Sequence, residues 1–159
     1  MSIFPTRILL ATDGSAEAEL ATGTAVDLAR MSDSELHVVH VLDDDPGLAL
    51  LYPEAPDPDG AEVSDQALER DLERRADQLG RQILDAEAER VQAAGGTVAG
   101  THLAMGDAPR EIVNLAEDLD AGLVVMGSRG HGGIRRALMG SVSDTVVRHA
   151  HCPVLIVRT

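Results

Sequence analysis

Short apolar runs of strand length alternate with longer helix-type patterns along this chain. Such alternation is typical of a parallel sheet whose strands are joined by crossover helices. The apolar residues are almost all aliphatic, with one Phe, one Tyr and no Trp, as expected for strands buried on both faces. We therefore predict an α/β fold with a single doubly wound sheet of five parallel strands and helices on both faces. The predicted strands are Arg7–Thr12, Glu35–Val41, Val98–Leu103, Gly122–Met126 and Pro153–Val157.

Helical periodicity fills the segments between these runs, with apolar residues spaced three and four apart. In the charged segment 64–94 we expect the charges to form a solvated helix face. Pro109 stands in the first turn of a third helix, where its missing N–H does no harm. A fourth helix is expected from Ser141 to about His149. The predicted buried stripes are Ala18, Ala21, Ala25 and Leu28 in the first helix, Leu68, Leu72, Leu79, Ile83 and Ala86 in the second, and Ile112, Leu115, Ala116 and Leu119 in the third.

We predict a single domain spanning residues 1–159, because a chain of this length can bury one core. A segment at about 42–63 interrupts the alternation with Asp43-Asp44-Asp45 and then four prolines. So long a connection is usually a lid, a binding loop or disordered, and we interpret it as a mobile loop. Its aspartates either bind Mg²⁺ beside a ligand or belong to a solvated loop, which is the more common role.

Charge is distributed unevenly along the chain. The 13 basic residues, all Arg, stand against 27 acidic ones, which leaves a net charge of −14. Such a chain repels nucleic acid and anionic membranes, and it lacks the aromatic platforms used by single-strand binders. Residues 126–159, however, carry five Arg against Asp144 alone, a net of +4, while residues 1–125 carry a net of −18. The basic segment therefore indicates an anionic ligand bound locally, and the alternative is a chance clustering of arginines.

Cys152 is the single cysteine, so no disulfide forms within the chain, as in a reducing compartment. The amino terminus lacks the features of a signal peptide, and no apolar run approaches the roughly 20 residues that span a bilayer. We therefore expect a cytoplasmic protein. With His149 and His151 nearby, Cys152 would serve as a nucleophile or zinc ligand, or as a buried structural residue, which is more common. His37 and His40 alternate with valines on a strand, so we expect a packed or an edge position for them and not a catalytic role.

Glycines gather after the fourth predicted strand, in a motif that ends where the fourth helix begins. Gly127 and Gly130 are followed, after nine further residues, by Gly140-Ser141. Glycines let the backbone approach a phosphate closely, and a helix N-terminus attracts anions. The Ser141 and Ser143 hydroxyls would add donors. Neither a Gly-Lys-Ser/Thr nor a GxGxxG after the first strand occurs, so the site is neither a P-loop nor a dinucleotide-binding turn.

Polar residues also follow the first predicted strand, as Thr12-Asp13-Gly14-Ser15. Open α/β sheets bind ligands beyond the carboxyl ends of their strands, where the strand order reverses. Asp13 would contact such a ligand there, or it would cap the first helix. Both interpretations remain open from the residues alone.

Together these motifs resemble the ATP-binding branch of the universal stress protein family. The resemblance spans nearly the whole chain, and it implies a Rossmann-like fold of the adenine nucleotide α-hydrolase type with strand order 3-2-1-4-5. It also implies ATP as the ligand, together with Mg²⁺. The segments that carry it are Ile8–Ser15, Gly106-x-x-Pro109-x-x-Ile112, Gly127-x-x-Gly130 with nine residues before Gly140-Ser141, and Cys152–Val157.

The resemblance implies a role for each matching position. Asp13 would accept hydrogen bonds from the ribose or help to order the metal and phosphates, and Val41 would meet the adenine edge through its backbone. Arg129 lies inside the glycine loop, and Val154–Val157 is the implied edge of a homodimer. The implied nucleotide contacts are Ala11, Thr12, Asp13, Val41, Met126, Gly127, Arg129, Gly130, Gly140, Ser141, Val142 and Ser143.

These features predict an ATP-binding regulatory module of the stress response. The alternative is a slow ATPase or phosphotransferase at the same site. Efficient phosphoryl transfer needs a cation, a metal-binding carboxylate and a group that orients the nucleophile. Arg129 and Asp13 supply the first two, but the sequence offers no obvious base, so we expect negligible or very slow hydrolysis. A nucleotide-free dimeric interaction protein ranks last, because the glycine motif is present.

Overall fold

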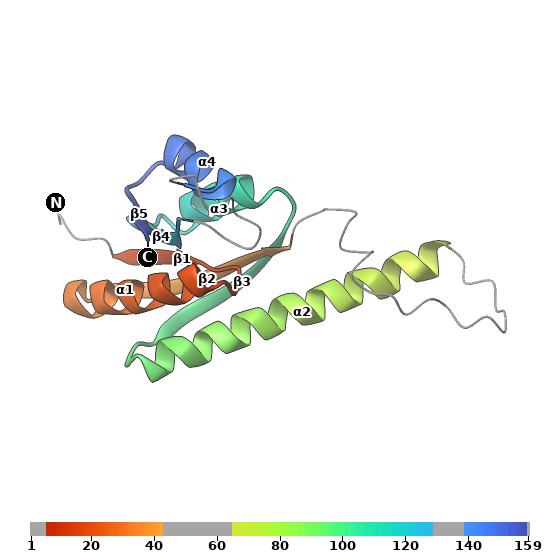
Figure 1. Ribbon diagram of the computed structural model, residues 1–159, viewed down its shortest axis with the longest axis horizontal. Coiled ribbons are helices and arrows are strands. Elements are labelled where there is room, and N and C mark those ends of the chain that lie inside the picture. The colour runs from red at the N-terminus through yellow and green to blue at the C-terminus, as the bar shows by residue number, and fades with distance from the viewer. Residues whose placement is uncertain (1–5, 43–64, 129–138, 159) are drawn as a thin grey trace.

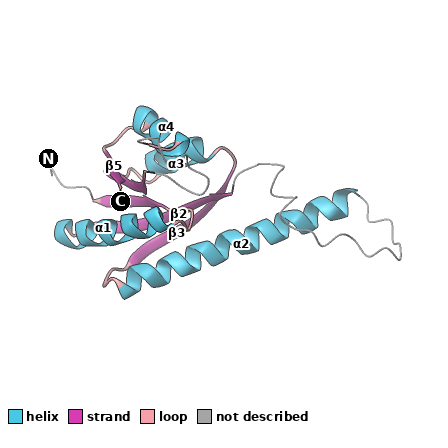
Figure 2. Cartoon of the chain, viewed as in Figure 1, coloured by secondary structure: helices cyan, strands magenta, loops and turns pink. Residues whose placement is uncertain are grey.

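A five-stranded parallel sheet in the order β3-β2-β1-β4-β5 forms the centre of the molecule. The computed structural model describes residues 6–42, 65–128 and 139–158. Strands and helices alternate along the chain, as Figures 1 and 2 show. This confirms the predicted fold class and strand order. The elements are β1 (Arg7–Ala11), α1 (Ala16–Ser32), β2 (Glu35–Leu42), α2 (Asp65–Ala93), β3 (Val98–Met105), α3 (Ala108–Asp118), β4 (Leu123–Gly127), α4 (Ser141–His149) and β5 (Val154–Val157).

Helices cover both faces of the sheet, with α1 and α2 on one side and α3 and α4 on the other (Figure 1). Successive side chains of a strand point to opposite faces. Accordingly Ile8 and Leu10 of β1 pack in the cluster under α1 and α2, whereas Leu9 packs in the cluster under α3 and α4. The predicted stripes of α1 and α3 lie at these two interfaces.

Strands β2 and β3 both run past their predicted ends. Their pairing continues through Val41↔Ala104 and Leu42↔Met105, and the Gly106 N–H then donates to the Leu42 carbonyl at 2.9 Å. Val41 therefore lies one residue before the end of β2 and does not end it. The fourth helix begins at Ser141 and ends at His149, as predicted.

Helix α2 buries a different stripe from the one that its leucines predict. Leu68 and Leu79 are 46% and 38% exposed, so that prediction was wrong. Gly80 faces the sheet instead, where an added Cβ would lie 2.5 Å from Leu103 Cδ1 and 3.1 Å from Leu42 Cδ2. A glycine and a carboxylate occupy contact positions, so an apolar stripe could not reveal the buried side. The residues on that side are Ala76, Gly80, Leu84, Glu87 and Val91.

The strand order reverses between β1 and β4. Although these strands are hydrogen-bonded neighbours, the helix after β1 covers one face and the helix after β4 covers the other (Figure 1). The chain therefore departs in opposite directions from their carboxyl ends, and a crevice opens between the departing segments. In the described parts of the chain, no helix is both long and apolar enough to cross a membrane.

Candidate functional site

A cavity of about 230 Å³ lies at the carboxyl ends of β1 and β4, where the strand order reverses. The structure brings ten of the sequence-predicted site residues together on its wall. Arg129 and Gly130, the other two, fall outside the described residues, as do Asp43–Asp45 and nearly all of the predicted mobile loop. The ten are Ala11, Thr12, Asp13, Val41, Met126, Gly127, Gly140, Ser141, Val142 and Ser143.

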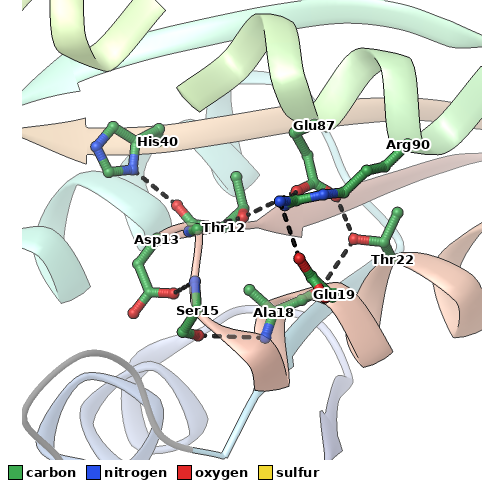
Figure 3. Close-up of polar contacts among 10 residues, drawn as sticks. Thr12, Asp13, Ser15, Ala18, Glu19, Thr22, His40, Glu87 and Arg90 are labelled. Carbon is green, nitrogen blue, oxygen red and sulfur yellow. Dashed lines mark hydrogen bonds and ion pairs between the residues drawn. The ribbon is translucent and has the colours of Figure 1, made fainter. Parts of the chain in front are cut away.

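The end of β1 presents Asp13 to the cavity through a tight local turn (Figure 3). Asp13 Oδ1 accepts a hydrogen bond from the Ser15 N–H at 2.9 Å, and Gly14 between them has a φ of +79° that favours glycine. Ser15 is the N-cap of α1, since its Oγ accepts from the Ala18 N–H at 3.3 Å. Asp13 therefore braces the capping residue and is not itself the cap.

The start of α4 forms the opposite wall of the cavity. Its N-cap is Gly140, which has no side chain to accept a hydrogen bond from the first turn. The first N–H groups of a helix have no partner within the helix, and the helix dipole makes this end positive. Ser141, Val142 and Ser143 contribute that turn and line the cavity. The arrangement therefore suits an anion.

Ser143 joins the two ends of the glycine-rich segment. Its hydroxyl lies 2.8 Å from the carbonyl of Ser128 and 3.1 Å from that of Gly140, and the Gly140 N–H also donates to Ser128 O at 2.6 Å. The Ser143 side chain is buried. Its hydroxyl thus has a structural role, and its backbone N–H is the group that can serve a ligand.

Gly127 is required by the close packing of β4 against the start of α1. A Cβ there would lie 3.1 Å from the backbone carbon of Glu17 and 3.3 Å from the Ala18 nitrogen. Next to it, the Ser128 hydroxyl donates to Glu17 Oε2 at 2.5 Å. These contacts fix the carboxyl end of β4 relative to α1.

His40 is a cavity residue that the sequence did not single out as part of the site. It is buried on β2, and its Nδ1 lies 2.8 Å from the Thr12 carbonyl oxygen (Figure 3). Because a carbonyl only accepts, Nδ1 carries the hydrogen. His40 thus holds the end of β1 beside β2, and its expected packing role within the sheet is confirmed. Val39, Ile112 and Ser128 also line the cavity.

A buried carboxylate of α2 contacts the cavity residue Thr12. Glu87 of α2 is fully buried, although it belongs to a segment whose charges were expected to be solvated. Its Oε2 accepts from the Thr12 hydroxyl at 3.2 Å, and its Oε1 contacts the Thr22 hydroxyl of α1 (Figure 3). Glu87 therefore connects α1 and α2 to the residue that ends β1. A charged residue among charged neighbours gives no local sign of this role.

Arg90 extends these contacts to the surface. Its guanidinium lies 3.2 Å from Glu87 Oε2 and 2.9 Å from Glu19 Oε1 of α1 (Figure 3). A buried carboxylate needs such a charged partner together with hydrogen bonds. Arg90, Glu19 and Glu87 thus form an ion-pair chain from the surface to Thr12.

Cys152 is the remaining sequence candidate for reactive chemistry. Cys152 packs against the cluster under α3 and α4, and burial raises the pKa of its thiol, which disfavours the nucleophilic thiolate. These observations support the interpretation of Cys152 as a buried structural residue. Within the described ranges, no group of three or more His, Cys, Asp or Glu side chains could hold a metal ion. Asp13 would therefore need oxygens of a bound ligand or of water to complete a metal site.

Comparisons with known proteins agree on one family. A model described as the universal stress protein family matches residues 5–158. A curated universal stress protein of Staphylococcus saprophyticus is 37% identical over 154 residues, covering 96% of this chain and 83% of that protein.

Solved structures extend the similarity to the fold. Universal stress protein UspA from Lactobacillus plantarum has a TM-score of 0.75 at 27% identity, covering 99% of this chain and 100% of its own. The universal stress protein from Archaeoglobus fulgidus in complex with dAMP has a TM-score of 0.60 at 24% identity, with 98% and 99% covered. Both similarities extend across the sheet and its helices.

The buried position of Glu87 generates a stability prediction. Glu87→Ala leaves the Thr12 hydroxyl without its acceptor, so we expect the free energy of unfolding to fall by about 1–3 kcal/mol. Glu89→Ala, on the exposed side of the same helix, changes it by less than about 0.5 kcal/mol. Urea unfolding followed by circular dichroism measures both values. Equal stability of the two variants would contradict the buried role of Glu87.

Proposed function

The chain belongs to the universal stress protein family, and from this premise we propose that it is a cytoplasmic, nucleotide-dependent regulator whose ligand is ATP. The observation that carries the proposal is the cavity between β1 and β4, where an apolar wall and an uncapped helix N-terminus flank a carboxylate. An adenine nucleotide needs these three environments, for its base, its phosphates and its ribose or bound metal.

The cavity suggests one orientation for the nucleotide. The adenine would lie against the apolar wall near Val39, Val41 and Ile112, where a flat ring replaces water at little cost. Its edge would meet the backbone of Val41. The base would therefore occupy the β2 and α3 side of the crevice.

The phosphates would lie at the opposite side, over the first turn of α4. The N–H groups of Ser141, Val142 and Ser143 can donate to phosphate oxygens there. Gly127 ends β4 beside them, and Arg129 and Gly130 follow in the sequence. The five arginines in residues 126–159 add a locally positive field.

Asp13 would lie between the base and the phosphates. Its carboxylate can accept hydrogen bonds from the ribose hydroxyls or bind Mg²⁺ that bridges to phosphate oxygens. The resemblance to the ATP-binding branch, and the absence of a P-loop lysine, make Mg²⁺ the expected counter-charge for the triphosphate.

The role of α4 can be tested by removing one backbone donor. Ser141 is the first helical residue, where proline is well tolerated, and Gly140 before it has the extended backbone that precedes proline (φ −74°, ψ 167°). Ser141→Pro should keep the fold but weaken ATP binding about tenfold or more, the effect of one hydrogen bond to a charged group. Isothermal titration with ATP, ADP, AMP, cAMP and adenosine in Mg²⁺ buffer measures this.

Ser141→Ala is the matched control, because it removes the hydroxyl and keeps the N–H. Adenosine affinity should be the same in both variants and the original protein. The proposal fails if the original protein binds none of these ligands. If Ser141→Pro weakened the binding of adenosine and of ATP equally, the phosphates would not lie over the first turn of α4.

We further expect ATP binding without efficient turnover. The cavity holds Asp13 for a metal, but His40, its buried histidine, already uses Nδ1 to hold Thr12 O. Incubation of the protein with ATP and Mg²⁺, followed by phosphate release, should show negligible or very slow hydrolysis. Turnover at an ordinary enzymatic rate of about 1 s⁻¹ or more that disappears in Asp13→Ala would instead support the ATPase alternative.

The β5 edge is the proposed homodimer contact. Among residues 6–42, 65–128 and 139–158, β5 pairs with β4 on one side only, and a free strand edge is a template for pairing with another chain. Sedimentation velocity should detect a dimer, and hydrogen exchange at Val154–Val157 should accelerate on dilution to monomer. A monomer at every concentration would rule this out.

A further inference from the structure

Two histidines from neighbouring strands direct ring nitrogens toward one another on the sheet. His37 Nδ1 of β2 lies 3.1 Å from His102 Nε2 of β3, and the ring centroids are 5.3 Å apart. Both residues are partly buried, and 13% of the His37 side chain is exposed. Two imidazole nitrogens at this separation either share a hydrogen or bind one ion between them.

The pair is separate from the nucleotide cavity. Neither histidine lines that cavity, and His37 lies four residues before Val41 on β2, about 13 Å along a strand. His37 shares a face with Val39, which packs under α3, but it lies nearer the amino end of the strand. The nucleotide site therefore does not explain the pairing.

A glycine leaves space directly beside both nitrogens. Gly100 on β3 faces the pair, and a Cβ on it would lie 3.1 Å from His37 Nδ1 and 3.4 Å from His102 Nε2. Its φ does not lie in the left-handed region, so backbone conformation alone does not require glycine there. The space next to the two nitrogens is thus open because of this residue.

A carboxylate lies behind His37. His37 Nε2 is the one buried side-chain nitrogen or oxygen of the described residues that has no hydrogen-bond partner, and Glu35 Oε2 lies 3.6 Å from it. The Arg7 guanidinium donates a hydrogen bond to Glu35 Oε2 at 2.9 Å. An anion there favours the hydrogen on Nε2 and leaves the Nδ1 lone pair facing His102, as in metal sites where a carboxylate orients a histidine ligand.

We propose that His37 Nδ1 and His102 Nε2 chelate a divalent transition-metal ion of the Cu²⁺ or Ni²⁺ type in the space left by Gly100. With metal–nitrogen bonds near 2.0–2.1 Å, a 3.1 Å separation gives a nitrogen–metal–nitrogen angle of about 95–102°. Imidazole nitrogens suit Cu²⁺ and Ni²⁺, and a nitrogen site binds Cu²⁺ most tightly of the divalent first-row ions. Water occupies the other positions.

Metal binding requires one hydrogen to move within the imidazole of His102, from Nε2 to Nδ1. When the ion replaces the nitrogen–nitrogen hydrogen bond, His102 carries its hydrogen on Nδ1 and His37 keeps its own on Nε2. Both histidines bind the ion through the lone pair of a neutral imidazole.

The experiment titrates CuCl₂ and NiCl₂ into tag-free, nucleotide-free protein, by calorimetry and by electron paramagnetic resonance for Cu²⁺. The original protein should bind one Cu²⁺ with spectral coupling to two imidazole nitrogens. His102→Ala should lower the affinity by more than about tenfold, since even the loss of an outer-sphere partner has such an effect. Gly100→Ala keeps both ligands but fills the space, so it should weaken binding while the thermal unfolding midpoint stays close to the original.

The control is the double variant His149→Ala with His151→Ala, which removes two histidines near Cys152 and should bind Cu²⁺ like the original protein. Thermal unfolding of every variant verifies that it is folded. Loss of binding in the control with retention in His102→Ala would overturn the proposal, as would the absence of any Cu²⁺ or Ni²⁺ binding by the original protein.

Discussion

Strand β1 pairs in parallel with β2 on one side and β4 on the other, and the rest of the structure depends on this central position. Because the chain leaves β1 toward one face and β4 toward the opposite face, their carboxyl ends cannot both be covered by helices. The cavity is therefore a consequence of strand order. Asp13 follows β1, and Ser141 begins the helix that follows β4, so both residues line the cavity.

Two hydrogen bonds to Thr12 fix the wall of the cavity at the end of β1. His40 holds the carbonyl of Thr12 from the side of β2, and Glu87 accepts the hydroxyl of the same residue from α2. Both groups are buried, where hydrogen bonds are electrostatically stronger than in water. Thr12 thus connects the cavity to β2 and α2. A ligand that displaces the end of β1 would alter the packing of α2.

The sequence predicts the sheet well and the long helix poorly, for a physical reason. Strands buried on both faces are continuous aliphatic runs, so their positions are visible locally and only their ends move, as with β2 and Leu42. The contact side of α2 instead depends on Gly80, which fits only because Leu103 lies beside it, and on Glu87, whose partners lie in β1 and α1. The same distinction separates the site residues: Asp13 and Gly127 directly follow predicted strands, whereas His40 and Glu87 owe their roles to partners distant in the sequence.

The connection between Ser128 and the start of α4 has a consequence for how the family site can change. Through Ser143 and Gly140, the carbonyl of Ser128 holds the first turn of α4 next to the end of β4. These hydrogen bonds hold Ser128 and Gly140 next to each other whatever residues lie between them in the sequence. Substitutions at residues 129–138 therefore leave these anchoring hydrogen bonds in place, and we expect the sheet and α4 to keep their arrangement in such variants.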